Sequence, residues 1–318
     1  MTTPELLTIG RVSVDLFAEQ LGKPMREVSS FRKSIGGTAT NVAVAAARLG
    51  NRAALATKVG DDAFGDYVTH ALESQFGVDP RFVSVDQDLK TPLAFAVLDP
   101  PADPDIIFYR EPRAPDLNLD PDDVEADVIR EVPILWLPAS RFSDERSHRC
   151  VSHFLQIRGR KAHTVLDLDW RPSFWSSPAD ASQKIRPMLQ RFSIAIGNRE
   201  ECAIAVGTED PEQAADRLLE EGLEMAVIKL GAEGVMIATQ DGVRVSVEPF
   251  WVDAVCGLGA GDAFGGAFCH GLLRGWDPEK IITWGNAAGA IVTSRLMCAD
   301  DMPTEKDIHE LLASRAGS

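Results

Sequence analysis

Short apolar segments alternate with amphipathic segments along most of this 318-residue chain. Such alternation is typical of βα units, in which each buried strand is followed by a helix that crosses over to the next parallel strand. The pattern therefore predicts the α/β class, with one mostly parallel sheet and helices packed against it. The buried strands that we expect are Leu6–Val14, Ala53–Val59, Ile134–Pro138, Thr164–Leu168, Ser193–Gly197 and Ala226–Leu230.

Two stretches, residues 12–35 and 91–112, depart from this rhythm. Large apolar residues recur at every second position from Leu93 to Val97, which is typical of strands with one exposed face. We expect both stretches to pair as a small second sheet, with Asp99–Asp105 as a turn between two of its strands. Helices are expected at Asn41–Leu49, Phe64–Phe76, Ser143–Arg158, Glu200–Val206, Pro211–Glu221, Gly261–Arg274 and Pro278–Arg295.

The charge balance and the cysteines narrow the class of protein. The 48 acidic and 32 basic residues give a net charge of -16, which repels nucleic-acid phosphates and anionic membrane surfaces. The five cysteines are scattered and never spaced as Cys-x-x-Cys, so the sequence indicates neither a disulfide framework nor a zinc site. Without a signal-peptide core or a membrane-spanning apolar run, we expect a cytoplasmic protein that binds neither nucleic acid nor membrane.

A glycine-rich turn, Gly257–Asp262, leads directly into an apolar helix and is the strongest chemical signal. Backbone N–H groups converge at such a helix start and can bind an anion, which the glycines allow to approach closely. The carboxylate of Asp262 can accept the proton of an attacking hydroxyl group, so the turn indicates phosphoryl transfer. The simpler alternative is that Asp262 only complements the helix dipole. The motif GxxxxGK[ST] is absent, and these glycines do not fit GxGxxG.

A second glycine cluster, Gly36 and Gly37, precedes the helix expected from Asn41. Asn41 can hydrogen-bond a polyol, although capping the helix is the commoner use of Asn there. Together the two clusters resemble the ribokinase (PfkB) family of sugar kinases, whose signatures are GGxxxNxAxxxARLG and GAGD. Gly10–Asp15 and Lys58–Gly65 are similar to two further segments of that family, so the resemblance extends over essentially the whole chain.

The resemblance implies a ribokinase-like three-layer α/β/α fold with a mostly parallel central sheet and a small β-sheet lid. It implies one kinase domain over residues 1–318, with the lid strands within 12–35 and 91–112. It also implies ATP and Mg²⁺ as cofactors and a homodimer, because lid sheets in this family often pair across a dimer.

The resemblance also assigns roles to individual residues. Asp262 becomes the base that deprotonates the acceptor hydroxyl group, next to the backbone amides of Gly259, Ala260 and Gly261. The residues implied to hold the sugar are Asp15, Gly36, Gly37 and Asn41.

Three further segments resemble the nucleotide side of the family. Asn198 and Glu201 look like its NxxE motif near the magnesium-bound phosphates, with Glu201 reaching Mg²⁺ through water; the alternative is a capping box. Lys229–Gly234 resembles a nucleotide-binding turn, for which a plain β-turn is the alternative. The small residues after Asn286 resemble an adenine-pocket wall, although close helix packing also favours them. The implied nucleotide contacts are Lys229, Gly231, Gly234 and Asn286.

Two arginines narrow the chemical class of the acceptor: Arg110 in the expected second sheet, and Arg171 just after a strand of the main sheet. The planar guanidinium group is suited to binding a carboxylate, a group that a neutral sugar lacks. A chain with a net charge of -16 does not attract an acid by its overall field, so local arginines would be needed for it. Sugar acids are therefore favoured over ribose or fructose. The alternative is ion pairs within the protein, between Arg171 and Asp167 or Asp169 and between Arg110 and Glu111.

The segment Asp167–Pro172, with Trp175 after it, is similar to the DxDxRP motif of the family branch that acts in inositol catabolism. The branch that acts on 2-dehydro-3-deoxygluconate has Asn at the place of Asp169. Cys256 stands where the family has Asp or Asn, and a thiol is a poor ligand for a hard cation. The sequence therefore does not favour activation by a monovalent cation such as potassium.

The residues and the resemblance together predict an ATP- and Mg²⁺-dependent kinase that phosphorylates a primary hydroxyl group of a keto-deoxy sugar acid, foremost 5-dehydro-2-deoxy-D-gluconate. The second sheet is expected to close over the sugar and to exclude water. Alternative acceptors are 2-dehydro-3-deoxygluconate, another ketose, ribose or a nucleoside. An alternative of another class is a non-catalytic sugar or nucleotide sensor on the same fold.

Overall fold

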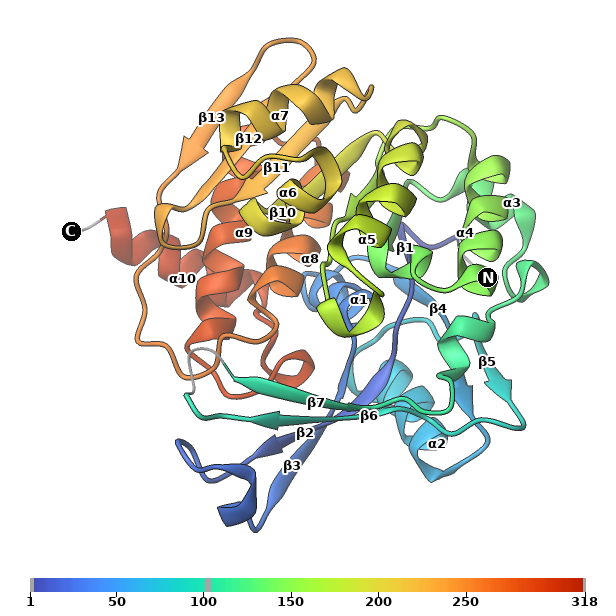
Figure 1. The fold of residues 1–318 in the computed structure, drawn as a ribbon. Coiled ribbons are helices and arrows are strands. Elements are labelled where there is room, and N and C mark those ends of the chain that lie inside the picture. Colours follow the sequence, from blue (N-terminus) through green and yellow to red (C-terminus); the bar gives the residue numbers. More distant parts are fainter. Residues whose placement is uncertain (1–2, 101–103, 317–318) are drawn as a thin grey trace.

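The computed structural model describes residues 3–100 and 104–316. Its largest element is a nine-stranded sheet of order β13-β12-β11-β10-β9-β8-β1-β4-β5 (Figure 1). Neighbouring strands pair in parallel from β5 to β11, whereas β12 and β13 are antiparallel, so the expected mostly parallel sheet is confirmed. The strands are β1 (Leu6–Ile9), β4 (Ala53–Gly60), β5 (Val83–Asp86), β8 (Ile134–Pro138), β9 (Thr164–Asp167), β10 (Ile194–Asn198), β11 (Met225–Lys229), β12 (Val235–Thr239) and β13 (Arg244–Val247).

Helices cover both faces of this sheet, because the buried strands send successive side chains to opposite sides. Ile134 and Trp136 of β8 belong to one apolar core, and Leu135 and Leu137 belong to the other. The first core lies against α1 (Thr38–Arg48), α2 (Ala63–His70), α8 (Ala260–Leu273), α9 (Pro278–Thr293) and α10 (Glu305–Ala316). The second lies against α3 (Ala126–Glu131), α4 (Glu145–Arg158), α5 (Pro178–Ile185), α6 (Arg199–Val206) and α7 (Pro211–Glu220). The three-layer α/β/α architecture is therefore confirmed.

The small second sheet is also confirmed, and it lies at one side of the body (Figure 1). It consists of four strands in the order β3-β2-β6-β7. They are β2 (Ser13–Ala18), β3 (Phe31–Gly36), β6 (Leu93–Val97) and β7 (Asp105–Tyr109), and we call this sheet the lid. The predicted turn Asp99–Asp105 lies partly outside the described residues. Within residues 3–100 and 104–316, no helix has both the length and the apolar character that a membrane crossing requires.

The expected strand Leu6–Val14 is wrong as a single element. β1 ends at Ile9, β2 begins at Ser13, and the two strands belong to different sheets. The apolar run hides this change of sheet because Val12 and Val14 are as fully buried as the residues of β1. The sequence also did not reveal β5, β12 and β13, which are short strands at or near the edges of the sheet.

Candidate active site

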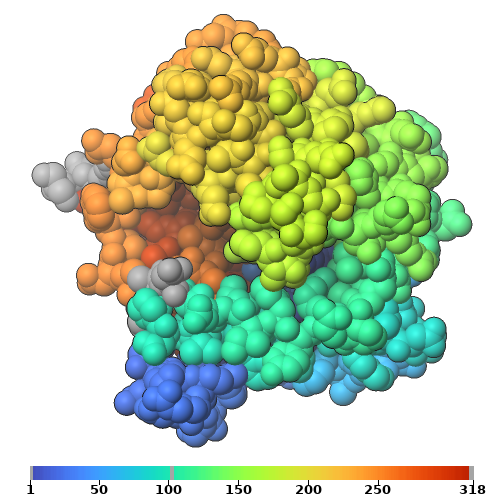
Figure 2. Space-filling view, in the orientation of Figure 1, coloured from blue at the N-terminus to red at the C-terminus, as the bar shows by residue number. Residues whose placement is uncertain are grey.

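Five parallel strands, β1, β8, β9, β10 and β11, end at the same edge of the central sheet. Ligands of α/β proteins usually bind outside the carboxyl ends of such strands. Here polar or charged residues stand at those ends or just beyond them: Arg11, Ser140, Asp167, Asn198 and Lys229. β2 continues the chain beyond β1, which places the lid beside this edge, and Figure 2 shows the surface hollowed between the lid strands and the body.

A cavity lies between the lid and the body, and we call it the lid cavity. β6 contributes Ala94 to it, and β7 contributes Ile106 and Phe108. The structure thus brings together most of the residues predicted for the sugar and for the proton transfer. Those that line this cavity are Asp15, Gly37, Asn41, Arg110, Arg171, Gly259 and Asp262.

Asp262 lies in the first turn of α8 and is held by Asn41 of α1, whose Nδ2 donates to its Oδ2 at 2.7 Å. Burial raises the pKa of Asp262 to about 6, although Asn41 and Arg171 act in the opposite direction. A carboxylate with this pKa is ionised at pH 7 and is a stronger base than an ordinary aspartate. Asn41 is not the cap of α1, because Gly37 occupies that position.

Asp15 lies on β2 and accepts a hydrogen bond from Ser13 Oγ at 2.6 Å. Burial raises the pKa of Asp15 to about 6, and the nearby charge of Asp262 adds to this effect. Gly36 leaves room for this carboxylate, and Gly37 leaves room for the backbone of Arg11. A Cβ atom at Gly36 would overlap the Asp15 carboxylate, and one at Gly37, whose φ is +102°, would overlap the carbonyl group of Arg11.

Asp169 joins two arginines at the edge of the lid cavity. Arg11 Nη1 lies 2.9 Å from Asp169 Oδ2, and Arg171 Nε lies 3.3 Å from Asp169 Oδ1. Burial alone would raise the pKa of Asp169, but the two guanidinium groups hold it below the ordinary value. Arg171 therefore forms one of the alternative ion pairs, yet its side chain is still 44% exposed and lines the cavity.

Arg110 pairs with Asp116 and not with Glu111, which we had considered as its partner. Arg110 Nη2 donates to both carboxylate oxygens of Asp116 at 2.9 Å. The Asp116 side chain is fully buried. Arg110 is thus fixed in position at the wall of the lid cavity.

A second cavity, of about 360 Å³, lies on the other side of the start of α8, and we call it the glycine cavity. The predicted nucleotide residues Lys229, Gly231, Gly234 and Asn286 all line it. Ala260 and Gly261 also line it, whereas Gly259 and Asp262 line the lid cavity. The first turn of α8 therefore separates the two cavities.

Close packing of backbone shapes the glycine cavity. Gly234 has a φ of +93°, and a Cβ atom there would overlap the carbonyl oxygen of Val247. Asn286 Nδ2 donates to the carbonyl oxygens of Val247 and Glu248 at 3.3 and 3.2 Å, so this amide holds the neighbouring chain. On the same helix, a Cβ atom at Gly289 would lie only 3.1 Å from the Ala260 carbonyl oxygen.

Asn198 and Glu201 form the capping box that was the alternative to a functional role. Asn198 Oδ1 accepts from Glu201 N at 2.8 Å, and Glu201 Oε2 accepts from Asn198 N at 2.6 Å. Neither residue lines either cavity, but Glu201 lies 3.7 Å from Lys229 Nζ. Lys229 in turn lies close to Gly261, so Glu201 is connected to the start of α8.

Sequence reasoning missed two functional candidates. Arg11 stands two residues after the end of β1, and a charged residue so close to the end of a buried strand is a signal that could have revealed it. Asp167, at the end of β9, was considered only as a partner of an arginine. It is buried, and burial raises its pKa well above the ordinary value although Lys229 opposes this. Within residues 3–100 and 104–316, no cluster of three or more His, Cys, Asp or Glu residues could hold a metal ion alone.

Comparison with known proteins agrees with this geometry. The description "pfkB family carbohydrate kinase" matches residues 3–305. The chain is 32% identical over 316 residues to a 5-dehydro-2-deoxygluconokinase of Geobacillus thermodenitrificans, covering 97% of this chain and 93% of the relative. It is 30% identical over 314 residues to the 5-dehydro-2-deoxygluconokinase of Clostridium perfringens, covering 97% and 92%.

Solved structures show the same fold. A ribokinase II from E. coli in complex with ATP and Mg²⁺ aligns with a TM-score of 0.88 and 23% identity, over 98% of this chain and 99% of that one. A fructokinase from Xylella fastidiosa with bound ATP aligns with a TM-score of 0.85 and 22% identity, over the same shares. The family description covers residues 3–305, the kinase relatives align over nearly their full length, and the fold agrees. This chain therefore belongs to the pfkB family of carbohydrate kinases and is a sugar kinase.

Proposed function

We propose that this kinase transfers the γ-phosphoryl group of ATP to a primary hydroxyl group of a keto-deoxy sugar acid, foremost 5-dehydro-2-deoxy-D-gluconate. The observation that carries the proposal is the position of the first turn of α8 between two cavities. One cavity offers a carboxylate base and arginines, and the other offers glycine backbone. The names of the relatives support the choice of acceptor.

Asp262 is the proposed base. Its pKa of about 6 leaves it ionised at neutral pH, and the hydrogen bond from Asn41 fixes the carboxylate. The acceptor hydroxyl group gives its proton to Asp262 while its oxygen forms the bond to the γ-phosphorus and the bond to the leaving oxygen breaks. The backbone amides of Gly259, Ala260 and Gly261 stand at the helix N-terminus, where they stabilise the negative charge of the transferring group.

The acceptor is proposed to bind in the lid cavity. Asp15 and Asn41 are placed to hydrogen-bond its hydroxyl groups, since Asn41 Oδ1 has no partner among the described residues. Arg110 and Arg171 are the proposed carboxylate ligands, because both line the cavity while each is held by an aspartate. Gly36 and Gly37 act by leaving room for Asp15 and for the chain that carries Arg11.

ATP is proposed to bind in the glycine cavity, with the adenine beside Asn286 and the phosphates near Lys229. Gly231 and Gly234 let the nucleotide approach the backbone. Mg²⁺ supplies charge neutralisation at the phosphates when it is bound.

The residues present fit a magnesium ion that keeps most of its water ligands. Glu201 and the buried Asp167 are hard oxygen donors. Both are close to the charge of Lys229, which lowers the pKa of Asp167 and lies 3.7 Å from Glu201. A cation near Asp167 would favour its charged form, which burial disfavours. The absence of a larger cluster among the described residues agrees with a metal held mainly by phosphate and water.

The lid and the cysteines support three further parts of the proposal. Residues 1–318 are proposed to form one kinase domain, with the lid as a part of it.

The exposed side chains of Ile107 and Tyr109 on β7 support a homodimer formed through the lid sheet. All five cysteines are free and buried, as expected for a protein of the reducing cytoplasm.

A panel assay tests the acceptor. ATP consumption is measured with 5-dehydro-2-deoxy-D-gluconate, 2-dehydro-3-deoxygluconate, fructose, ribose and a nucleoside, each with and without Mg²⁺. We expect the highest kcat/KM for the keto-deoxy acids and no turnover without Mg²⁺. A preference for a neutral sugar would overturn the sugar-acid proposal, and tight ATP binding without turnover of any acceptor would favour a sensor.

A further inference from the structure

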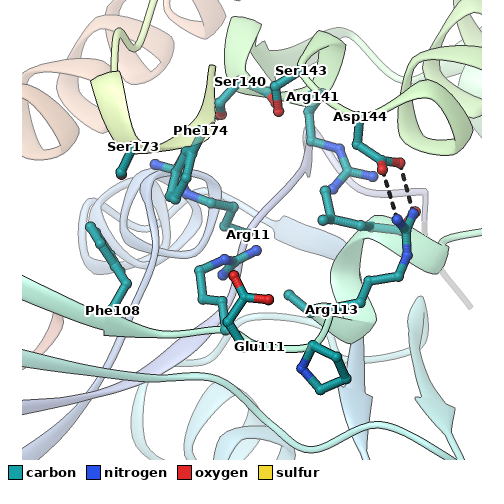
Figure 3. A pocket seen from close by; sticks show the side chains of 14 residues that line it. Arg11, Phe108, Glu111, Arg113, Ser140, Arg141, Ser143, Asp144, Ser173 and Phe174 are labelled. Atoms are coloured by element: carbon teal, nitrogen blue, oxygen red, sulfur yellow. Dashed lines mark hydrogen bonds and ion pairs between the residues drawn. The ribbon is translucent and has the colours of Figure 1, made fainter. Parts of the chain in front are cut away.

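A third cavity, of about 420 Å³, adjoins the lid cavity, and apart from Arg110 the residues that line it have no proposed contact with the acceptor or ATP. The two cavities share Arg11, Phe108 and Arg110 as a common wall. We call the third cavity the arginine pocket because four arginines line it: Arg11, Arg110, Arg113 and Arg141. Figure 3 labels Arg11, Arg113 and Arg141. Ser143 and Ser173 add hydroxyl groups to the lining.

The four arginines differ in how their charges are compensated. Arg113 donates to both carboxylate oxygens of Asp144 at 2.7 Å and to Asn118 Oδ1 at the same distance, so its charge is matched (Figure 3). Arg110 and Arg141 instead share one carboxylate, that of Asp116, at 2.9 and 3.4 Å. Two guanidinium groups therefore face a single buried anion.

Arg141 is the least satisfied of these groups. Its side chain is only 1% exposed, and Nε and Nη2 have no hydrogen-bond partner among the described residues. Burial lowers the pKa of Arg141, the charges of Arg110 and Arg11 lower it further, and Asp116 opposes them. A buried cation with open donors is costly unless an anion completes its surroundings.

The remaining contacts concentrate positive charge at the common wall. The guanidinium carbon of Arg11 lies 4.8 Å from the centre of the Phe174 ring, and that of Arg110 lies 5.5 Å from the same ring. Arg11 shares the carboxylate of Asp169 with Arg171, just as Arg110 shares that of Asp116 with Arg141. Four guanidinium groups therefore face two carboxylates at and around the common wall, which leaves an excess of positive charge there. Glu111 also lines the pocket, where its exposed side chain points toward the labelled arginines (Figure 3) and compensates part of this charge.

We propose that the arginine pocket is a second oxyanion-binding site, which takes a carboxylate or phosphate group of a small acid on Arg141, Arg110 and Arg11. This chemistry has two sources. One is the acid end of the acceptor, reaching past Phe108 from the lid cavity, and this source rests on the proposed function. The other is a free anion such as inorganic phosphate, which does not depend on it.

Calorimetric titration distinguishes the sources and needs no turnover. Sodium phosphate and 5-dehydro-2-deoxy-D-gluconate are each titrated, without ATP, into the wild-type protein, Arg141→Met and Arg171→Met. Arg171 is the matched control, because it lines the lid cavity and not the arginine pocket. We expect Arg141→Met to weaken the binding of at least one of the two ligands tenfold or more, and Arg171→Met to change phosphate affinity less than twofold.

The outcomes separate cleanly. Phosphate affinity that depends on Arg141 supports the free-anion source, and acid affinity alone that depends on Arg141 supports the acceptor source. If Arg141→Met leaves both affinities unchanged, the site does not exist as proposed. A preference for neutral acceptors in the panel assay would refute the proposed function without touching the phosphate result.

Arg141 is buried, so its replacement can impair folding, which a melting curve reveals. A crystal structure of the wild-type protein grown with sodium phosphate then provides the test. Phosphate bound at Arg141 supports the free-anion source. A second crystal, grown with 5-dehydro-2-deoxy-D-gluconate, tests the acceptor source in the same way. If neither phosphate nor the carboxylate of the acid lies in the arginine pocket, the proposal is overturned.

Discussion

The lid cavity and the glycine cavity, which lie on either side of the first turn of α8, are built from different kinds of groups. The lid cavity is built from charged side chains fixed by ion pairs, such as Arg171 with Asp169 and Arg110 with Asp116. The glycine cavity is shaped by backbone, for example where Gly234 contacts the Val247 carbonyl group. The difference teaches that acceptor recognition should depend on several charged side chains and on pH. Nucleotide recognition should depend mainly on the shape of the cavity, with Lys229, the one charged side chain among the described residues that line it, at the proposed phosphate position.

The largest effect should come from Asp262→Asn, which removes a charge on the lid side. We expect kcat to fall by about three powers of ten or more, because the amide cannot take a proton, while ATP affinity changes less than twofold. Steady-state kinetics and ATP calorimetry measure the two quantities. Asp253→Asn, at an exposed position lining neither cavity, is the control and should retain activity. Turnover within tenfold of wild type would show that Asp262 is not the base.

Arg171→Met and Arg110→Met should each lower kcat/KM for the acid acceptor by roughly one to two powers of ten, because a charge-assisted fork to a carboxylate is lost. KM for ATP should stay nearly constant, and discrimination against the matching neutral alcohol should collapse. Arg171 gives the cleaner test, because its partner Asp169 keeps Arg11 at 2.9 Å, whereas the buried Asp116 would keep only Arg141 at 3.4 Å after Arg110 is replaced. Equal losses with acid and neutral acceptors would make the arginines structural. The control is Arg149→Met on α4, where the side chain is 71% exposed.

Activity should depend on pH through the lid cavity. The pKa of Asp262 is raised to about 6, so kcat/KM should fall about tenfold as the pH drops from 7 to 5. Asp15 has a similar pKa, so the two carboxylates titrate as a pair. The affinity for ATP alone should change much less over this range. A flat profile down to pH 4.5 would contradict the raised pKa.

The raised pKa of Asp262 favours activity at neutral pH but lowers the stability of the folded protein there. Because the folded-state pKa lies above the unfolded value of 3.8, the free energy of unfolding decreases as the pH rises from about 4 through 6. Asp262→Asn removes this penalty, so the variant should melt at a higher temperature than wild type at pH 7, and the gain should shrink towards pH 4. Melting curves at the two pH values check the sign.

A smaller effect is expected on the glycine side from Trp251→Ala. Trp251 lines that cavity and is 80% exposed, so it has free surface to stack on a flat base. We expect KM for ATP to rise a few-fold with kcat and acceptor KM nearly unchanged. In the wild-type protein, ATP should quench or shift the fluorescence of this exposed tryptophan, and that change should vanish in the variant. An unchanged KM for ATP would exclude the stacking contact.

The smallest effect should be that of monovalent cations. Cys256 stands where the family has an oxygen ligand, and its side chain has none. The thiol is also buried, and burial raises its pKa, so that it stays uncharged and is a poor ligand for a hard cation. Activity in potassium, sodium and choline chloride at equal ionic strength should agree within about twofold. A strong dependence on potassium would mean that backbone oxygens suffice for the site.

Local motifs were predictable because their chemistry lies within a few consecutive residues. The Gly259–Asp262 turn and the Gly36–Gly37 pair require particular residue types at fixed spacing, and both were found at the cavities. The break between β1 and β2 was not predictable from hydropathy, since Val12 is buried on the way from one sheet to the other. The partner of Arg110 was also missed, because Asp116 lies in a short 3-10 helix, Pro115–Asn118, which is too short to show a periodic pattern.

The sequence by itself determined the α/β class, the positions of the glycine turns and the aspartate at the start of α8. These follow from periodicity and from backbone conformations that few residues allow. Only the tertiary structure decided that Arg11 pairs with Asp169 and lines one cavity with Arg141, that Asp116 serves two arginines, and that this third cavity opens beside the lid. The reason is that these residues follow β1, β8 and β9, and the strand order of the sheet, not the chain order, sets which of their side chains become neighbours.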